Sequence, residues 1–230
     1  MHVLGGDALA WESLTRRLSR GEAEAIQLAL APRVRPGGLS LRAVRTVAGA
    51  ACASTGDKLF AAAVLLAFPR LEPLGQAAAT GCARIAYASG LRAFREGETL
   101  IAAIEGLPTR PDVLFISGHG VAHPRGCGLA SHLGLALGLP AIGCARRLIG
   151  ASASLSAGEP GDCRPLVDDE GRQLGAACVT RPGSRPILVS VGHMVDLGTA
   201  TALTLACSRG RLFPEPLRLA AAAARAARGA

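Results

Sequence analysis

Aromatic and lysine side chains are scarce in this sequence. Only 3% of the 230 residues are Phe, Trp or Tyr, although half of the residues are hydrophobic. A core made under that constraint must be built mainly from Ala, Val, Leu and Ile. Lysine occurs once, at Lys58, so arginine supplies almost all of the positive charge.

The sequence also lacks a membrane span and a secretory signal. No apolar run reaches the roughly 18 residues that a membrane-spanning helix needs. The opening residues, MHVLGGDALAWESL, do not place a basic segment before an apolar one, as a signal peptide does. A length of 230 residues suits one sizeable domain and is short for two. We therefore expect a single domain over residues 1–230, located in the cytoplasm and without a membrane partner.

Paired cysteine motifs are absent as well. The seven cysteines form no CxxC pair and no zinc-type spacing. Their number is odd, the chain is not small, and no feature marks it as secreted. We therefore expect most of them to be reduced and buried as small hydrophobic side chains. They are Cys52, Cys82, Cys127, Cys144, Cys163, Cys178 and Cys207.

Positive charge, in contrast, is abundant. The formal net charge is +8 and the isoelectric point is near 9.8. Such an excess indicates a polyanionic partner such as nucleic acid. A coding sequence rich in G and C would produce the same surplus of arginine and alanine, so the charge by itself leaves the partner open.

The first part of the chain predicts a helix followed by a sheet. Apolar residues at helical spacing favour an amphipathic helix over residues 7–31, where prolines end it. Three strand-like stretches follow at 44–53, 59–68 and 71–83. The turns STGDK and PRLEP separate them at hairpin distances, so we expect these strands to be antiparallel.

The middle of the chain favours parallel strands. A helix at about 96–105 precedes residues 112–117, DVLFIS, a short apolar run typical of a strand buried on both faces. A helix at 129–138 then leads to a second buried strand at 141–145. A crossover of this kind pairs the two strands in parallel.

The last third alternates loop, strands and helices. Residues 147–171 are rich in Gly, Pro and Ser and are predicted to be mostly loop. Strands near 173–180 and 187–191 and a helix near 197–207 come before an Ala/Arg-rich tail.

This order of elements predicts the fold class. It is typical of an α/β domain with an RNase H-like mixed sheet, antiparallel in its first three strands and parallel afterwards, flanked by helices. The core is expected at 40–215, between the N-terminal helix at 7–31 and a C-terminal helix or tail at 215–230.

One loop carries most of the chemical information. The stretch FISGHGVAHPRGCGLASHLG at 115–134 directly follows a buried strand. Loops at the carboxyl ends of parallel strands are where such sheets bind ligands, and glycines there let backbone N–H groups approach closely. The alternative is a tight turn with histidines bonded to neighbouring carbonyls. The candidate binding residues in the loop are Gly118, His119, Gly120, His123, Arg125 and Gly128.

The same stretch closely resembles the signature of the endonuclease V family, in which DGHG is followed by HPR and an ASH-type helix. LRAFRE at 91–96 resembles the motif that carries the family's catalytic glutamate, which falls on Glu96. Nine residues earlier, Tyr87 stands where the family has a tyrosine wedge. Gly90, between the two, is counted with the binding residues.

Three further motifs keep the family's order. AGAAC at 48–52 resembles the first-strand motif, and IGCAR at 142–146 resembles the strand whose end carries a catalytic lysine. Gly143 in that strand is a further candidate for substrate binding. VGHMV at 191–195 places the family's histidine at His193.

The resemblance implies a function. Endonuclease V recognises deaminated purines, chiefly inosine, in DNA or RNA and cuts the second phosphodiester bond on the 3′ side. In that family clustered carboxylates hold Mg²⁺, which activates water and stabilises charge on the phosphate. A pocket reads the extruded base while the wedge replaces its stacking.

The sequence departs from the family at the metal site. Ala51 stands where the first-strand motif has an aspartate, and Ser117 replaces the aspartate of DGHG. The lysine position is Arg146, which can grip phosphate but cannot shuttle a proton at neutral pH. Glu96 remains as a weak candidate metal ligand, and His193 also remains. We therefore expect no cofactor, or Mg²⁺ if the family's activity persists in part.

No nearby acid replaces the missing carboxylates in the sequence pattern. Asp57 lies in a predicted turn, and Asp112 lies at the wrong end of its strand. Asp196, just beyond His193, is kept as a remote candidate.

Three functions stay open. The first is a protein that has lost the nuclease activity but binds nucleic acid, or a deaminated base, in the family pocket. The second is an enzyme for a small molecule or modified base, with Ser117 as nucleophile and His119 or His193 as base. Cys52 is disfavoured as nucleophile because strand alternation points it away from the face of Ala51. The third is an active deoxyinosine endonuclease with a remodelled metal site. The oligomeric state stays open.

Overall fold

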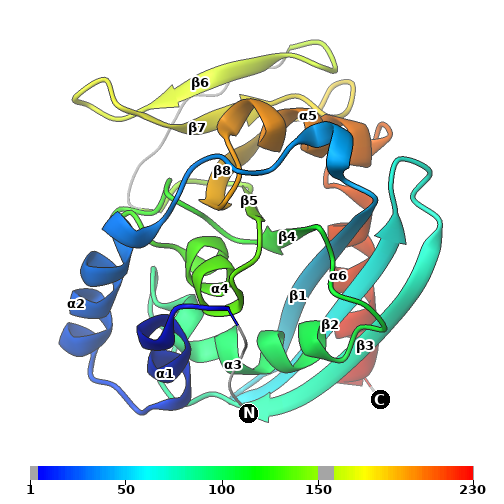
Figure 1. The fold of residues 1–230 in the computed structure, drawn as a ribbon. Helices are drawn as coiled ribbons and strands as arrows, with labels where there is room; N and C mark the ends of the chain where they lie inside the picture. The colour runs from blue at the N-terminus through cyan, green and yellow to red at the C-terminus, as the bar shows by residue number, and fades with distance from the viewer. Residues whose placement is uncertain (1–4, 150–157, 230) are drawn as a thin grey trace.

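One mixed sheet of eight strands runs through the protein (Figure 1). The computed structural model describes residues 5–149 and 158–229. The strand order across the sheet is β3-β2-β1-β4-β5-β8-β7-β6. None of the described helices is long and apolar enough to cross a membrane.

The first three strands form an antiparallel meander, as predicted. They are β1 (Thr46–Thr55), β2 (Lys58–Ala67) and β3 (Pro73–Cys82). The turn between β1 and β2 contains Gly56 at a φ of +57°, a conformation that suits glycine. Alanines opposite one another, such as Ala51 and Ala62, keep both faces of this meander smooth enough for helices to pack closely.

The centre of the sheet is parallel, also as predicted. Strand β4 (Val113–Ser117) pairs in parallel with β1, and β5 (Ala141–Ala145) pairs in parallel with β4. Helix α4 (Leu129–Leu137) makes the crossover between β4 and β5, and every residue in it is buried. The carboxyl ends of β4 and β5 therefore lie side by side, and the loops that follow them share one edge of the sheet.

Beyond β5 the sheet differs from the expectation of further parallel strands. Strand β8 (Ile187–His193) runs antiparallel to β5, β7 (Gln173–Cys178) antiparallel to β8, and β6 (Cys163–Val167) antiparallel to β7. Strand β6 lies inside the segment predicted to be loop. It is an edge strand whose residues are almost all exposed, so the apolar pattern that reveals buried strands is missing.

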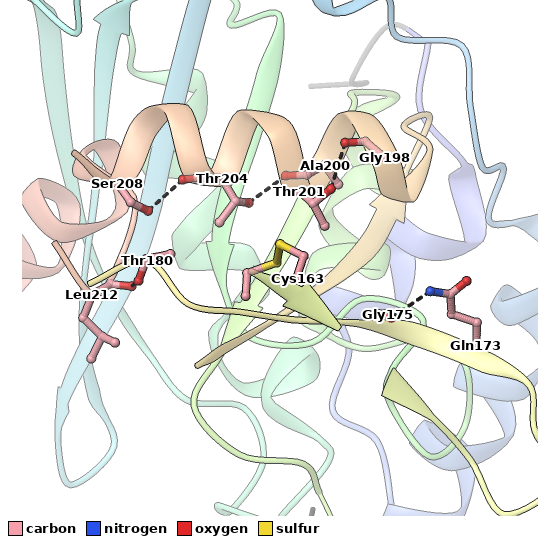
Figure 2. Close-up of a disulfide and its surroundings, with 11 residues drawn as sticks. Cys163, Gln173, Gly175, Thr180, Gly198, Ala200, Thr201, Thr204, Ser208 and Leu212 are labelled. Carbon is pink, nitrogen blue, oxygen red and sulfur yellow. Dashed lines mark hydrogen bonds between the residues drawn. A yellow bond between two sulfur atoms is a disulfide. The ribbon is translucent and has the colours of Figure 1, made fainter. Parts of the chain in front are cut away.

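Two of the seven cysteines form a disulfide, which corrects the expectation for that pair. Cys163 of β6 and Cys178 of β7 face each other across the antiparallel register, with 4.2 Å between their Cα atoms. Figure 2 shows the disulfide beside helix α5 (Leu197–Ser208), which packs on β7. Among the free cysteines, Cys127, Cys144 and Cys207 are buried as predicted.

Helices cover both faces of the sheet (Figure 1). Helix α3 (Arg92–Glu105) packs with α4 and the N-terminal helices on one face, around Ala48 and Ala50 of β1. Helix α6 (Glu215–Gly229) packs with α5 on the other face, around Val47 and Ala51. Helix α3 begins four residues earlier than predicted, so Glu96 lies inside its second turn rather than at its start.

The single N-terminal helix predicted over 7–31 is two helices, α1 (Ala8–Thr15) and α2 (Arg20–Leu30). The chain is extended at Arg16, and Ser19 with Glu22 forms a capping box that starts α2. The Ser-x-x-Glu spacing was the sequence signal for this second start. Short 3-10 turns at Ala31–Arg33 and Leu41–Ala43 lead into β1.

Helix α6 approaches the sheet at a glycine. A Cβ atom added to Gly49 of β1 would overlap the backbone of Pro216 in the first turn of α6. We predict that Gly49→Ala pushes α6 outward and lowers the free energy of unfolding by about 1–3 kcal/mol, the usual cost of overpacking. Urea unfolding followed by circular dichroism measures this change.

Gly21 of α2 provides the matched control, because a Cβ there meets no atom within 4 Å. Gly21→Ala is expected to leave stability unchanged or to raise it by up to about 1 kcal/mol, the helix preference for alanine. Equal unfolding midpoints for Gly49→Ala and the wild type would contradict the close approach of α6.

Candidate functional site

A cleft of about 630 Å³ opens where β4 and β5 end. Its walls come from the loop before α3, the loop after β4, the end of β5 and residues 217–225 of α6. The topology gathers these segments, together with the stretch after β7 and the stretch before α6, from distant parts of the chain. Of the residues predicted from the sequence, the cleft is lined by Tyr87, Gly90, Ser117, Gly118, His119 and Arg146.

Arginine dominates this cleft, which we call the arginine cleft. Its seven arginines are Arg92, Arg146, Arg147, Arg181, Arg211, Arg218 and Arg225, and no lining residue is acidic. Within the described residues, ion pairs engage only Arg92, with Glu96, and Arg218, with Glu215. A smaller neighbouring cleft of about 240 Å³ shares three of the arginines and adds Arg185. The result is a strongly positive surface suited to a chain of phosphates.

The sequence pointed to only one of these arginines as a site residue, Arg146. The others lie at the start of α3, after β7, before α6 and on α6 itself. No local motif marks them, because only the folded sheet brings these segments together. The overall surplus of arginine was the sequence signal for these residues, and for Arg92 its spacing of four residues from Glu96 was a second signal.

Tyr87 stands at the wall of the arginine cleft with 70% of its side chain exposed. An aromatic ring left this open in a chain with one tyrosine presents a flat apolar face to solvent. Such a face can stack on a nucleic-acid base.

Glu96 is held by Arg92, an arginine outside the set of site residues predicted from the sequence. The Nε and Nη2 atoms of Arg92 donate to the two carboxylate oxygens of Glu96 at 3.0 and 2.7 Å, and Nη1 donates to the carbonyl oxygen of Ser117 at 2.8 Å. Burial opposes the charged form of Arg92, but the hydrogen bonds and negative charge of Glu96 outweigh it, so its pKa is raised. The spacing of four residues on a helix was the available signal for this pair.

The residues present do not fit the metal that the family resemblance implies. Both oxygens of Glu96 are already engaged by Arg92. Ala51 has no donor atom and is buried on the α6 face, and Ser117 offers a neutral hydroxyl. The described part of the chain contains no cluster of three or more His, Cys, Asp or Glu side chains able to hold a metal ion. Mg²⁺ is normally held by carboxylates, which this site does not supply.

The three other candidate acids all have structural partners. Asp57 pairs with Arg95. Asp112 accepts hydrogen bonds from the backbone N–H groups at the start of β1, including that of Thr46. Asp196 caps the first turn of α5. None of them lines the arginine cleft, so none replaces a missing metal ligand.

The fold places His193 away from Glu96, the other candidate catalytic residue that remains from the family's motifs. Because β8 is antiparallel to β5, His193 pairs with Ala141 at the start of β5, whereas Ser117 pairs with Cys144 near its end. That separation of three residues corresponds to about 10 Å along the strand. His193 instead lines a separate cleft of about 250 Å³, and its Nδ1 accepts the N–H of Arg35.

A nucleophile with a base is not assembled at the site. The Nε2 of His119 hydrogen-bonds the carbonyl oxygen of Arg147 at 2.8 Å, and burial lowers the pKa of His119. Among the described residues, Ser117 makes no side-chain hydrogen bond to a histidine. Burial, with a contribution from the charge of Glu96, raises the pKa of Cys52 to about 12 and keeps it protonated. These contacts give the hypothesis of a serine or cysteine enzyme no support.

His123 and Arg125, predicted to bind substrate, brace the loops behind the cleft. The buried His123 ring accepts the N–H of Arg125 at Nδ1 and donates from Nε2 to the carbonyl of Gly90. Gln27 of α2 donates to the carbonyls of Gly90 and Cys127 and accepts from Nε of Arg125. These bonds fix the segment that carries Tyr87. No sequence pattern points to Gln27, because its partners lie far along the chain.

Three glycines predicted to contact substrate serve close backbone packing. A Cβ atom on Gly120 would overlap the carbonyl of Val191, and one on Gly128 would overlap that of His119. A Cβ atom on Gly143 would meet the backbone of the loop after β4. The N–H of Gly120 donates to the hydroxyl of Ser190. Close approach of neighbouring backbone therefore accounts for these glycines, and they shape the loop that Gly118 and His119 present to the cleft.

The bracing by His123 predicts a pH dependence of stability. Burial, followed by the nearby charge of Arg125, lowers the pKa of His123 from 6.5 to about 4. Between these two values the unfolded chain binds a proton that the folded chain does not, so stability falls as pH falls. His123→Gln, which keeps a donor for Gly90, should reduce this loss by about 1.4 kcal/mol per pH unit below 6.5.

Urea unfolding of the wild type and His123→Gln at pH 7, 6 and 5 measures that difference. The buried His132, whose pKa also falls to about 4 through burial, contributes a similar loss in both proteins and serves as the internal reference. Identical pH slopes for the two proteins would show that His123 is not held neutral by the fold.

Known proteins resemble this chain in sequence. The sequence model of the family described as endonuclease V matches residues 29–222. Endonuclease V of Roseiflexus sp. (strain RS-1) is 44% identical over 181 residues, which cover 79% of this chain and 81% of that protein. Endonuclease V of Methanothrix thermoacetophila is 45% identical over 177 residues, covering 77% of this chain and 78% of that protein.

Solved structures resemble the fold over most of its length. Endonuclease V of Streptomyces avermitilis superposes with a TM-score of 0.82 at 38% identity, covering 92% of this chain and 93% of that one. The catalytic domain of human endonuclease V gives a TM-score of 0.81 at 33% identity, covering 89% and 93%. Endonuclease V of Ciona intestinalis, in complex with a 24mer DNA containing an inosine followed by a ribo-adenosine, shares the fold with a TM-score of 0.79 at 24% identity, covering 90% and 96%.

Proposed function

Because this chain belongs to the endonuclease V family, we propose that it binds inosine-containing DNA or RNA in the arginine cleft without the metal-dependent cleavage of that family. The observation that carries the proposal is the contrast within the cleft. Seven arginines line it, while its nearby carboxylate, Glu96, is bound by Arg92. The chemistry for holding phosphates is present, and the carboxylate cluster for holding a metal is absent from the described residues.

The unpaired arginines favour a ligand with several negative charges. Arg146, Arg147, Arg181, Arg211 and Arg225 have no carboxylate within 4.0 Å among the described residues. Unpaired guanidinium groups gathered in one cleft repel each other, and an anion bound among them removes that repulsion. A nucleic-acid backbone supplies one negative charge per nucleotide and fits a cleft with several such groups along its walls.

Tyr87 supports the recognition of a base beside the backbone. Its exposed ring stands at the edge of the same cleft. A flipped base leaves a gap in the stack, and an aromatic side chain can fill it. In the Ciona intestinalis complex the same fold holds DNA that contains inosine. The support for inosine in this chain is therefore the family, and the support for nucleic acid is the geometry of its own residues.

The first prediction from this proposal concerns binding and cutting. The wild type should bind a single-stranded inosine oligonucleotide more tightly than the matching adenine oligonucleotide, and should cut neither in Mg²⁺ or Mn²⁺. Fluorescence anisotropy and denaturing gels measure the two activities. The Streptomyces avermitilis protein is the reference for cutting under the same conditions.

Other outcomes of these binding and cleavage assays would favour a different function. Cutting by the wild type that Glu96→Gln abolishes would overturn the proposal in favour of an active nuclease. Binding of free inosine without binding of the oligonucleotide would favour a small-molecule function instead. Equal affinity for the inosine and adenine oligonucleotides would remove the recognition of the deaminated base.

The second prediction concerns salt. Each phosphate contact made by the protein adds about 0.7 to the slope of log binding constant against log salt concentration for a single strand. Removing one cleft arginine, by Arg147→Gln or Arg211→Gln, should therefore lower the slope by about that amount. Arg17→Gln is the control, because Arg17 is an exposed arginine outside the cleft. Equal slopes for all four proteins would place the nucleic acid elsewhere on the surface.

A further inference from the structure

The Arg92 side chain joins the carboxylate site to the arginine cleft. It is 34% exposed and lines the cleft, whereas its partner Glu96 is 12% exposed. A guanidinium group carries five N–H donors. Three of them are engaged, two on Glu96 and one on the carbonyl of Ser117. One N–H on each Nη atom therefore remains for a ligand in the cleft.

The Arg92 side chain also neutralises the negative charge of Glu96. The carboxylate of Glu96 lies behind Arg92, next to the cleft, where without a partner it would repel a phosphate and would be costly to bury. Arg92 cancels that charge through two parallel hydrogen bonds, the strongest geometry for an arginine and a carboxylate. The neutral pair leaves the five unpaired arginines of the cleft unopposed.

A divalent cation has little to gain by displacing this arginine. The guanidinium stays charged at all ordinary pH values, so it does not yield its place by losing a proton. Mg²⁺ gives up its water shell reluctantly, and Glu96 with one hydroxyl and no further acid offers it a poor site. Arg92 and a metal would also need the same two oxygens of Glu96.

We propose that Arg92 is a built-in cation that stands in for the divalent metal, neutralising Glu96 and donating its two remaining N–H groups to a phosphate oxygen in the arginine cleft. Phosphate binding at this point is thus independent of divalent cations. The identity of the ligand as nucleic acid rests on the function proposed above, while the exclusion of the metal by Arg92 rests on this chain's side chains alone.

Arg84 supplies a matched control for both parts. It also makes a two-bond pair with a glutamate of α3, Glu98, at 2.7 and 2.9 Å. That pair lies outside the arginine cleft. Arg84→Leu therefore reproduces the loss of an arginine that pairs with a glutamate of α3, without touching the site. Thermal unfolding of both variants separates a loss of folding from a loss of binding.

The first test measures binding of a single-stranded inosine oligonucleotide in EDTA and in Mg²⁺. Wild-type affinity should be the same in both. Arg92→Leu should weaken binding on the order of tenfold and lower the salt slope by about 0.7, whereas Arg84→Leu should change neither. Arg92→Lys, which keeps the charge but not the two-bond geometry, should recover part of the affinity. A wild type that binds only with Mg²⁺, or an Arg92→Leu variant that binds like the wild type, overturns the proposal.

The second test measures Mn²⁺ binding by calorimetry and electron paramagnetic resonance, with no nucleic acid present. The double variant Ala51→Asp/Ser117→Asp restores the acids of the family's pattern. Arg92 remains on Glu96 in it, so Mn²⁺ binding should stay weak. Adding Arg92→Leu should tighten it on the order of tenfold or more, the loss of a competing charge-assisted pair. Adding Arg84→Leu instead should have no effect.

The two tests distinguish a failure of the proposed function from a failure of the role proposed for Arg92. If the wild type binds no oligonucleotide, the proposed function fails, and the Mn²⁺ titrations still decide whether Arg92 excludes the metal. If the double variant binds Mn²⁺ equally well with and without Arg92, the stand-in role of Arg92 fails, and the binding of nucleic acid is unaffected.

Discussion

Parallel pairing of β1, β4 and β5 is the constraint on which the rest of the site depends. It places the ends of β4 and β5 side by side, so that the loops following them open on the same edge of the sheet. Helix α6 closes one wall because Gly49 lets it approach β1, and the loop before α3 closes another because Gln27 and His123 hold it. The cleft exists only where these segments meet.

The positive charge of the cleft depends on the pairing of Arg92 with Glu96 and on the arginines that have no acidic partner. A metal site collects carboxylates around a cation, and their mutual repulsion is balanced by the ion. In this chain the cation belongs to the protein, since Arg92 faces Glu96 from one helical turn away. The remaining arginines keep a surplus of positive charge that no described acid offsets, and that surplus is available to a phosphate backbone.

Residues of the family's signature divide into two roles in this chain. His123, Arg125 and Gly120 support loops through hydrogen bonds and close packing, and they do not line the arginine cleft. Tyr87 and His119 face the cleft. The bracing residues therefore shape the binding surface through the loop that they hold, whichever chemistry takes place in the cleft.

The sequence by itself determined the antiparallel meander, the β4–α4–β5 crossover and the loop that lines the cleft, because these depend on local patterns of apolar residues and glycines. The resemblance of its motifs to those of the family also placed Ala51 and Ser117 at positions where those motifs carry aspartates. Only the tertiary structure decided that His193 lies away from Glu96, since that depends on the direction of β8. The exposed edge strand β6, the pairing of Arg92 with Glu96 and the gathering of arginines from separate elements were likewise decided by the fold, because charge and exposure are properties of neighbours in space.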